Sequence, residues 1–74
     1  MSLALSYFPP QKKLGMKIRL ARISCELSQK RLGELINISQ DGISRFERGE
    51  TIPDALILQA IARVLEQPMD YFQV

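Results

Sequence analysis

The chain has 74 residues, with 10 lysines and arginines against 8 aspartates and glutamates, a formal net charge of +2, one cysteine and no histidine. A chain this short makes one domain and buries a smaller fraction of its surface than a large one, so we expect a dimer more than a monomer. With Cys25 alone no internal disulfide can form, and without histidine there is neither an imidazole base nor a Cys–His zinc finger. We expect no metal, no other cofactor and no enzymatic activity.

No stretch approaches the roughly 20 apolar residues that span a bilayer. The apolar N-terminus, residues 1–8, lacks the leading positive charge of a signal peptide. A single cysteine also fits a reducing compartment. We therefore expect a soluble, cytoplasmic protein that binds no membrane, and the sequence indicates no small-molecule ligand.

The charges are unevenly distributed along the chain. Segment 12–48 has nine basic residues against four acidic ones, and segment 49–74 has one basic residue against four acidic ones. A small domain with a basic half and an acidic half can be steered in one orientation toward a polyanion. Ordinary solvated surface is the alternative explanation of the same counts.

Residues 1–10 are predicted to form an N-terminal arm and residues 11–74 the folded domain. The arm is uncharged, and the alternation of Leu3, Leu5 and Tyr7 with small side chains suits an extended segment. Two interpretations fit its apolar side chains. These side chains either clasp a second subunit or belong to a disordered or tag-derived terminus.

The first predicted helix covers residues 11–25. Its apolar residues repeat every three or four positions: Leu14, Ile18, Ala21 and Cys25. Leu20 lies beside this stripe and the lysines lie off it, so the helix is amphipathic. Cys25, on the apolar face, is expected to be a small buried residue and not a nucleophile.

Segment 28–49 is predicted to form two short helices that end near residues 36 and 48 and are joined by a tight turn. Ser28 and Ser39 are suited to be N-caps, because their hydroxyls can accept a hydrogen bond from the next turn of backbone. Asn37 and Gly49 tolerate the left-handed conformation that ends such helices. Both ends of each helix are therefore marked in the sequence.

This pair of helices separates two sets of side chains. One set falls where two crossing helices meet: Leu32, Ile36, Ile38, Ile43 and Phe46. The other set lies outside and suits phosphates and base edges: Gln29, Lys30, Gln40, Ser44, Arg45 and Arg48. Gly33 lets the backbones approach where the helices cross, at a cost in helix propensity of about 1 kcal/mol relative to alanine. The division is typical of a helix-turn-helix.

A fourth helix is predicted to follow Pro53, with Asp54 as its N-cap. Its inner face carries four apolar residues: Leu58, Ile61, Ala62 and Leu65. Pro68 suits the first turn of a short last helix, residues 69–72, because its missing N–H is not needed there. The sequence thus predicts an all-α fold, a compact domain of five helices.

The second helix of a helix-turn-helix can enter the major groove with its N-terminal end toward the bases. Glutamine pairs in bidentate fashion with adenine and arginine with guanine, each contact discriminating by about 1–3 kcal/mol. Gln40, Ser44 and Arg45 are therefore predicted to recognise bases. Asp41 can accept from a cytosine amino group, but we favour an ion pair with Arg45, because a local pair needs no external ligand.

Residues 14–72 resemble the DNA-binding domain of the phage lambda repressor and Cro family, the XRE family of helix-turn-helix proteins. The matching segments are LGMKIRLAR, LSQKRLGELINIS, GISRFERG and IPDALILQAIARVLEQPMDYF. The family usually has alanine at the position of Gly33 and glycine at the position of Asn37. These two departures are mild and leave the expected lambda-repressor-like fold unchanged.

The resemblance implies how the domain binds DNA. Gln29 would hydrogen-bond a phosphate and help to hold Gln40, which would recognise a base. Arg45 matches another base-contacting position, and Ser39 a phosphate-contacting one. The further candidates for phosphate contacts, each of which is alternatively solvated surface, are Lys17, Lys30, Arg31 and Arg48.

The resemblance also implies a salt bridge and a dimer. Arg22 and Glu47 match a pair that links the first and third helices in many relatives. The family typically dimerises through its last helices, which places two recognition helices about 34 Å apart on a palindromic site. The apolar residues available to a second subunit are Val64, Met69, Tyr71 and Phe72. The last two fit equally well as a cap on the core of the monomer.

These features predict a dimeric, sequence-specific DNA-binding transcriptional regulator, either a repressor or a controller. Its partners would be double-stranded DNA and a second copy of the chain. The alternative is an antitoxin-type protein-interaction module that neutralises a partner toxin and binds DNA secondarily.

Overall fold

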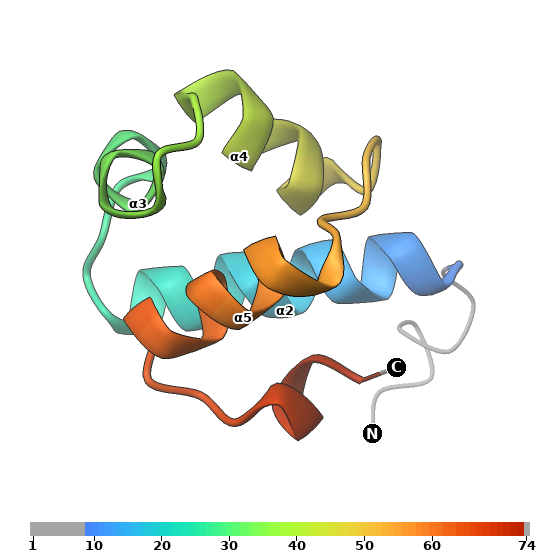
Figure 1. The fold of residues 1–74 in the computed structure, drawn as a ribbon. Coiled ribbons are helices and arrows are strands. Elements are labelled where there is room, and N and C mark those ends of the chain that lie inside the picture. The colour runs from blue at the N-terminus through green and yellow to red at the C-terminus, as the bar shows by residue number, and fades with distance from the viewer. Residues whose placement is uncertain (1–8, 74) are drawn as a thin grey trace.

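A computed structural model describes residues 9–73, in which four α-helices and a short 3-10 helix surround one apolar core (Figure 1). The elements in chain order are α2 (Pro10–Ser24), α3 (Gln29–Ile36), α4 (Gln40–Arg48), α5 (Ala55–Val64) and η1 (Met69–Phe72). The predicted all-α class is confirmed. The last of the five predicted helices differs, because its four residues form the tighter 3-10 turn.

The described chain starts just before α2. Pro9 is the N-cap residue of α2, and Pro10 occupies its first position, where a missing N–H needs no partner. The helix thus begins one residue earlier than predicted. Leu3, Leu5 and Tyr7 of the predicted arm lie outside the described residues. Within residues 9–73, no helix has the length and apolar character needed to cross a bilayer.

The predicted helix caps are present. Ser28, Ser39 and Asp54 each accept a hydrogen bond from the backbone N–H three residues later, at 2.9, 3.0 and 2.9 Å. Asn37 and Gly49 end α3 and α4 in the left-handed conformation, with φ of 61° and 75°. Local chemistry therefore fixes both ends of the helix-turn-helix.

Replacing Ser39 with alanine is expected to lower the free energy of unfolding by about 1 kcal/mol. The reason is that the N–H of Gly42 loses its hydrogen-bond acceptor at the start of α4. Urea denaturation followed by circular dichroism measures this loss. Ser24→Ala, at an exposed serine in the last turn of α2, is the matched control. An equal loss in the two variants would contradict the capping effect.

The core lies between the inner faces of the helices, and Phe72 of η1 closes it. The largest fully buried side chains come from all four α-helices and the turn after α5: Ile18, Leu32, Ile43, Ile61 and Leu65. Ile36 and Ile38, from the end of α3 and the turn, are partly buried against this cluster. Cys25 is also only partly buried, with its Sγ 3.5 Å from the carbonyl oxygen of Leu65. The predicted inward set is therefore confirmed as a core, with partial exposure at its margin.

Leu20, which the sequence places beside the apolar stripe of α2, is 58% exposed. A helix turns by about 100° per residue, so Leu20 falls away from the buried side and close to Met16 and Ile23. The latter two are 37% and 50% exposed. Together the three residues form a second apolar stripe, which we call the outer stripe of α2.

Two glycines allow close approach between backbone segments. A Cβ atom on Gly15 would lie well under 3.0 Å from the carbonyl oxygens of Phe46 and Glu47, so α2 touches the backbone of α4 directly. A Cβ atom on Gly33 would meet the carbonyl oxygen of Ile38 equally closely. Gly33 thus admits the backbone of the turn that leads from α3 into α4.

Candidate nucleic-acid interface

A buried ion pair connects α2 to α4. Arg22 Nε donates to Glu47 Oε2 at 2.6 Å, and Arg22 Nη2 donates to Glu47 Oε1 at 3.0 Å. The two side chains are only 10% and 2% exposed. Arg22 Nη1 also donates to the carbonyl oxygen of Leu27 at 2.7 Å. This bidentate pair fixes the separation of the two helices, as the resemblance implied.

Gln29 extends the ion pair to α3. Its Nε2 donates to Glu47 Oε1 at 3.1 Å. The resemblance implied that Gln29 binds a phosphate and helps to hold Gln40; among the described residues, the Gln29 amide hydrogen-bonds only Glu47. No buried side-chain nitrogen or oxygen in the described part of the chain lacks a hydrogen-bond partner. Three helices therefore meet at one satisfied polar cluster.

The outer face of α4 carries an exposed ion pair. Arg45 Nε lies 3.0 Å from Asp41 Oδ2, and the side chains are 53% and 69% exposed. An exposed pair at this spacing contributes about 0.3–0.5 kcal/mol, less than the roughly 1–3 kcal/mol of a bidentate base contact. Arg45 can therefore leave Asp41 for a base at small cost.

Arg48 lies at the C-terminal end of α4 between two partners. Its Nε donates to Glu50 Oε2 at 2.6 Å, its Nη2 donates to Glu50 Oε1 at 3.3 Å, and its Nη1 donates to the Ser44 hydroxyl. The hydrogen bond with Arg48 lowers the pKa of the Glu50 carboxyl, and the same contact raises the pKa of Arg48. The Ser44 hydroxyl serves as an acceptor here, so its own proton is free for another acceptor.

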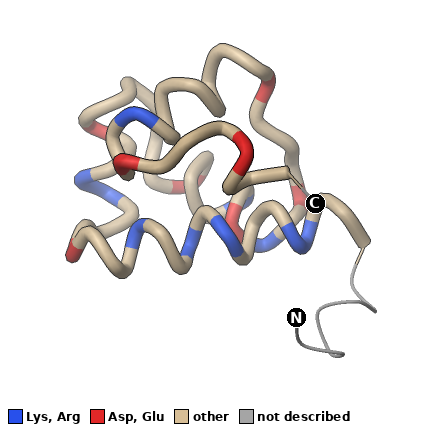
Figure 2. Tube along the Cα trace, turned by 90° about the horizontal axis from the view of Figure 1, so that it is seen from below, with Lys and Arg blue, Asp and Glu red and all other residues tan. Residues whose placement is uncertain are grey.

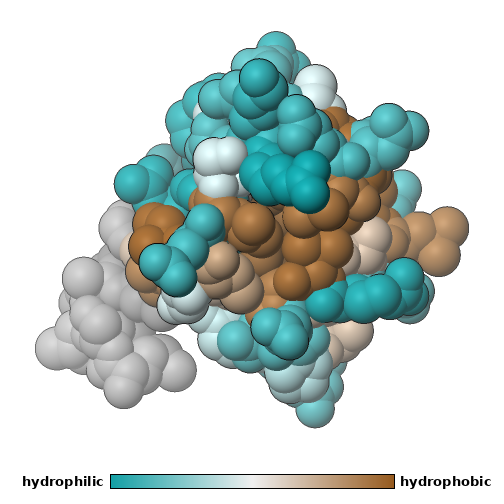
Figure 3. Space-filling model, turned by 90° about the vertical axis from the view of Figure 1, so that its left-hand side faces the viewer, coloured by the Kyte–Doolittle hydropathy of each residue, from teal (hydrophilic) through white to brown (hydrophobic). Residues whose placement is uncertain are grey.

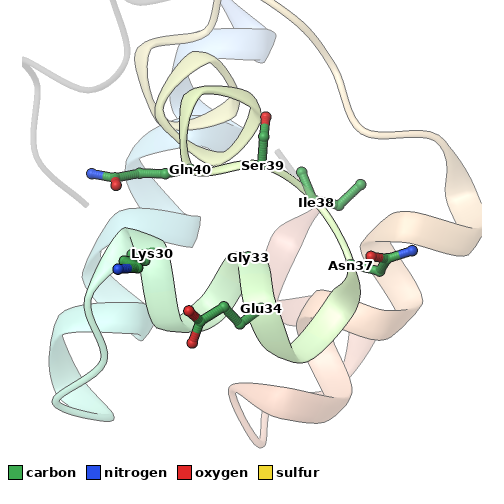
Figure 4. A pocket seen from close by; sticks show the side chains of 7 residues that line it. All are labelled: Lys30, Gly33, Glu34, Asn37, Ile38, Ser39 and Gln40. Atoms are coloured by element: carbon green, nitrogen blue, oxygen red, sulfur yellow. The ribbon is translucent and has the colours of Figure 1, made fainter.

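An open hollow lies beside the turn, between α3 and the start of α4 (Figure 4). Its lining residues are Lys30, Gly33, Glu34, Asn37, Ile38, Ser39 and Gln40. In Figure 4 the side chains of Lys30 and Glu34 come from α3, and Gln40 extends from the first turn of α4. The hollow thus brings together three residues predicted to contact DNA, Lys30, Ser39 and Gln40.

Two other predicted phosphate contacts lie elsewhere or are already paired. Lys17 Nζ donates to the carbonyl oxygen of Gln73 at 2.8 Å and lies 5.8 Å from the centre of the Tyr71 ring. This places Lys17 beside the C-terminal segment, on the side of α2 away from α4 (Figure 1). Arg31 Nη1 lies 3.4 Å from Glu34 Oε1 in an exposed ion pair. Lys17 is therefore not brought together with the α4 residues.

The four predicted dimer contacts fall in different environments. Phe72 is 3% exposed and belongs to the core, so it is unavailable to a second subunit. Tyr71 is half-buried and packs edge-on against Phe72, with ring centres 5.0 Å apart. Val64 is half-buried and Met69 is 38% exposed. Of the two predicted roles of Phe72, the structure has the one that caps the monomer core.

Apolar side chains also gather on the surface on the side where α3 lies in Figure 1. Figure 3 shows them at the centre of this face, with hydrophilic side chains above and below. Leu35 of α3 is 45% exposed. Ile52 and Leu56 are exposed further still, but they belong to the loop before α5 and to its first turn, which lie away from α3 in Figure 1. The polar hollow and this apolar surface are therefore distinct features of the molecule.

Two residues of this region are not predicted from the sequence. Glu34, which lines the hollow, is four positions after Lys30 and so shares its face of α3, a signal that the sequence does contain. Gly15, which admits the backbone of α4, has no such signal, because a glycine inside a helix suggests only reduced propensity. The contact that requires Gly15 is visible only in three dimensions.

Comparison with known proteins agrees with this geometry. A protein-family model described as helix-turn-helix matches residues 18–72. The chain is 36% identical over 59 residues to an uncharacterized HTH-type transcriptional regulator of Sinorhizobium medicae, covering 80% of this chain and 42% of that protein. It is 34% identical over 58 residues to repressor protein C2 of Salmonella phage P22, covering 78% of this chain and 27% of the repressor. The chain thus spans less than half of each relative.

Two solved structures have the same fold with clear sequence similarity. The P22 c2 repressor in complex with synthetic operator 9T superposes with a TM-score of 0.77 and 33% identity, over 81% of this chain and 91% of that one. Bacillus thuringiensis PlcR in complex with the peptide PapR7 and DNA superposes with a TM-score of 0.76 and 41% identity, over 82% of this chain and 21% of that one. The fold and the exposed α4 face define a helix-turn-helix DNA-binding domain. The chain belongs to the XRE-type helix-turn-helix family and is homologous to the DNA-binding domains of repressors.

Proposed function

We propose that this domain is the DNA-binding part of a dimeric transcriptional repressor or controller, which recognises a palindromic operator through the major groove. The observation that carries the proposal is the exposed face of α4. It presents Gln40 and Arg45 to solvent on a helix whose position is held by the buried pair of Arg22 and Glu47. Rigid support of this kind keeps base-contacting side chains in register with a groove.

Phosphate contacts would surround the start of α4. Ser39 caps the helix there, and the positive end of the helix dipole favours an anion at this place. Lys30 lies across the hollow from Gln40 and is exposed, so its ammonium group is free to approach a backbone phosphate. Gln29 would contribute mainly by holding Glu47, because its amide donates to that carboxylate.

Asp41 would act on Arg45 and not on a base. Its carboxylate lies 3.0 Å from the arginine Nε, which restrains the guanidinium on the outer face before DNA arrives. Phosphate repulsion disfavours a separate approach of the carboxylate to the groove. Among the remaining candidates, Ser44 would donate its hydroxyl proton to DNA while accepting from Arg48.

A second copy of the chain would bind through the exposed apolar residues at the C-terminal side. Val64, Met69 and Tyr71 retain exposed surface there, whereas Phe72 is committed to the core. Two copies related by a twofold axis would place their α4 helices about 34 Å apart, one turn of DNA. The twofold symmetry of such a dimer requires a palindromic operator.

The first test is the selection of binding sites from random DNA, with the purified protein run beside it on a sizing column. The proposal predicts an enriched palindrome and a dimer at the protein concentrations that bind it. Failure to enrich any sequence would count against the proposal and would favour the alternative function, an antitoxin-type protein-interaction module.

Arg45→Ala is expected to lower the affinity for the enriched operator by about 5- to 150-fold, the equivalent of a lost bidentate base contact of roughly 1–3 kcal/mol. It should also abolish the preference at one or two base pairs. Binding titrations against the operator and its single base-pair variants measure both effects. Equal discrimination by wild type and variant would contradict base recognition by Arg45.

Lys30→Ala is expected to weaken binding to all sequences alike and to reduce the salt slope, d log K/d log[salt], by about 0.9 in magnitude. Arg63→Ala, which removes an exposed positive charge from α5, is the charge-matched control and should leave the slope unchanged. If Lys30→Ala and Arg45→Ala both retained full affinity, the proposed orientation of the helix pair on DNA would be wrong.

A further inference from the structure

The outer stripe of α2 is apolar surface that the fold leaves uncovered. Met16, Leu20 and Ile23 follow the i, i+4, i+7 spacing of one helix face, and their side chains are 37%, 58% and 50% exposed. The opposite side of the same helix is already committed to the core through Leu14 and Ile18. The stripe covers about two helical turns, roughly 10 Å along the axis. A helix with apolar residues on two faces is suited to two partners.

Positive charge flanks this stripe on both sides. Four basic residues accompany it on α2: Lys12, Lys13, Lys17 and Arg19. The helix has no acidic residue between Pro10 and Ser24. Among the described residues, Lys12, Lys13 and Arg19 take part in no ion pair. Figure 2 shows the basic positions following one another along α2, at the edge of the molecule.

The charge and the shape together select the chemistry of a partner. An apolar stripe between two rows of cations is complementary to a helix with an apolar stripe between two rows of carboxylates. Duplex DNA fits the stripe poorly, because a phosphate backbone offers no apolar side chains to cover it. A lipid surface also fits poorly, since membrane binding scales with the apolar area that is buried and this stripe consists of three side chains, Met16, Leu20 and Ile23.

We propose that the outer face of α2 is a docking surface for an acidic amphipathic helix of a partner protein. Apolar side chains of the partner pack along Met16, Leu20 and Ile23, and its carboxylates pair with Lys12, Lys13 and Arg19. Opposite charge steers the encounter, and the apolar stripe sets the register. At its N-terminal end this surface adjoins the C-terminal end of α4, where Lys12 and Met16 line a hollow with Arg48. Arg19, Leu20 and Ile23 do not line that hollow.

The test uses the whole chain and a synthetic probe. The ¹⁵N-labelled protein is titrated with an 18-residue helical peptide that has leucines at i, i+4 and i+7 between two rows of glutamates. The same peptide with lysines in place of the glutamates is the control. We expect the acidic peptide to shift the amide signals of residues 12–23 in a salt-dependent manner, and the basic peptide to leave them unchanged.

Two exposed substitutions refine the result. Leu20→Gln and Arg19→Glu are each expected to lower the affinity for the acidic peptide by about tenfold or more. The first removes an apolar contact at the centre of the stripe, and the second reverses a flanking charge. The circular dichroism spectrum and the operator affinity of both variants should stay at wild-type values. Loss of peptide binding can therefore be distinguished from loss of the proposed DNA binding. Four outcomes would overturn the inference: equal binding of the two peptides, undiminished binding by both variants, tighter binding to phosphatidylserine vesicles than to the peptide, or shifts centred on another face.

Discussion

Glu47→Ala is expected to lower the free energy of unfolding by about 3–5 kcal/mol, the cost of leaving a buried charge without its partner. The guanidinium of Arg22 is 10% exposed and would lose both of its contacts to the Glu47 carboxylate. The Gln29 amide would lose its acceptor as well. A small domain has about 3–5 kcal/mol of stability in total, so this variant should be largely unfolded at 25 °C. Circular dichroism and urea denaturation measure the effect.

Glu50→Ala is the matched control for this prediction. Glu50 also accepts from an arginine Nε at 2.6 Å, but both side chains of that pair are about half exposed. Water replaces the lost contact there, so the stability should change little. The double variant Arg22→Met/Glu47→Leu should recover most of the loss of Glu47→Ala, because no charge then remains buried. A loss of stability of equal size at Glu47 and Glu50 would contradict the role assigned to the buried pair.

Gly15→Ala is expected to lower the free energy of unfolding by about 3 kcal/mol, at the upper end of the range for overpacking. The added Cβ would meet the carbonyl oxygens of Phe46 and Glu47 at less than 3.0 Å. These atoms belong to the backbone of α4 and cannot rotate away, so the two helices must move apart. The movement would also stretch the pair between Arg22 and Glu47. The unfolding temperature and the affinity for the operator should therefore both be lower than in the wild type.

Gly42→Ala is the control with the same chemistry at a different contact. A Cβ atom on Gly42 would meet the side-chain Cγ2 of Ile38, which can shift, and no backbone carbonyl. The helix propensity gained on α4, about 1 kcal/mol, offsets that small adjustment. A stability of Gly15→Ala equal to that of Gly42→Ala would show that α2 and α4 are not in the close contact described.

The parts of the fold that the sequence predicts are those with local causes. Ser28, Ser39 and Asp54 cap helices because their side chains accept from a backbone N–H three residues away. Asn37 and Gly49 end helices because they tolerate positive φ. Each of these effects depends only on nearby residues, so it is visible in the order of the chain.

The parts that the sequence does not predict depend on contacts between distant residues. The closeness of Gly15 to α4 and the hydrogen bond from Gln29 to Glu47 join segments far apart in the chain. Phe72 fitted both a core and a dimer surface, and only the packing of η1 against the core distinguishes them. The exposure of Leu20 was not predicted, because α2 has apolar residues on two sides and the sequence does not show which side is covered.

The exposed face of α4 is proposed to bind in the major groove of DNA. The most direct measurement is a titration of the ¹⁵N-labelled protein with a duplex enriched from random sequence. We expect the largest amide shifts at Gln29, Lys30 and residues 39–45, with the outer face of α2 unmoved. Shifts centred on α2 or α5, with residues 39–45 unchanged, would contradict it.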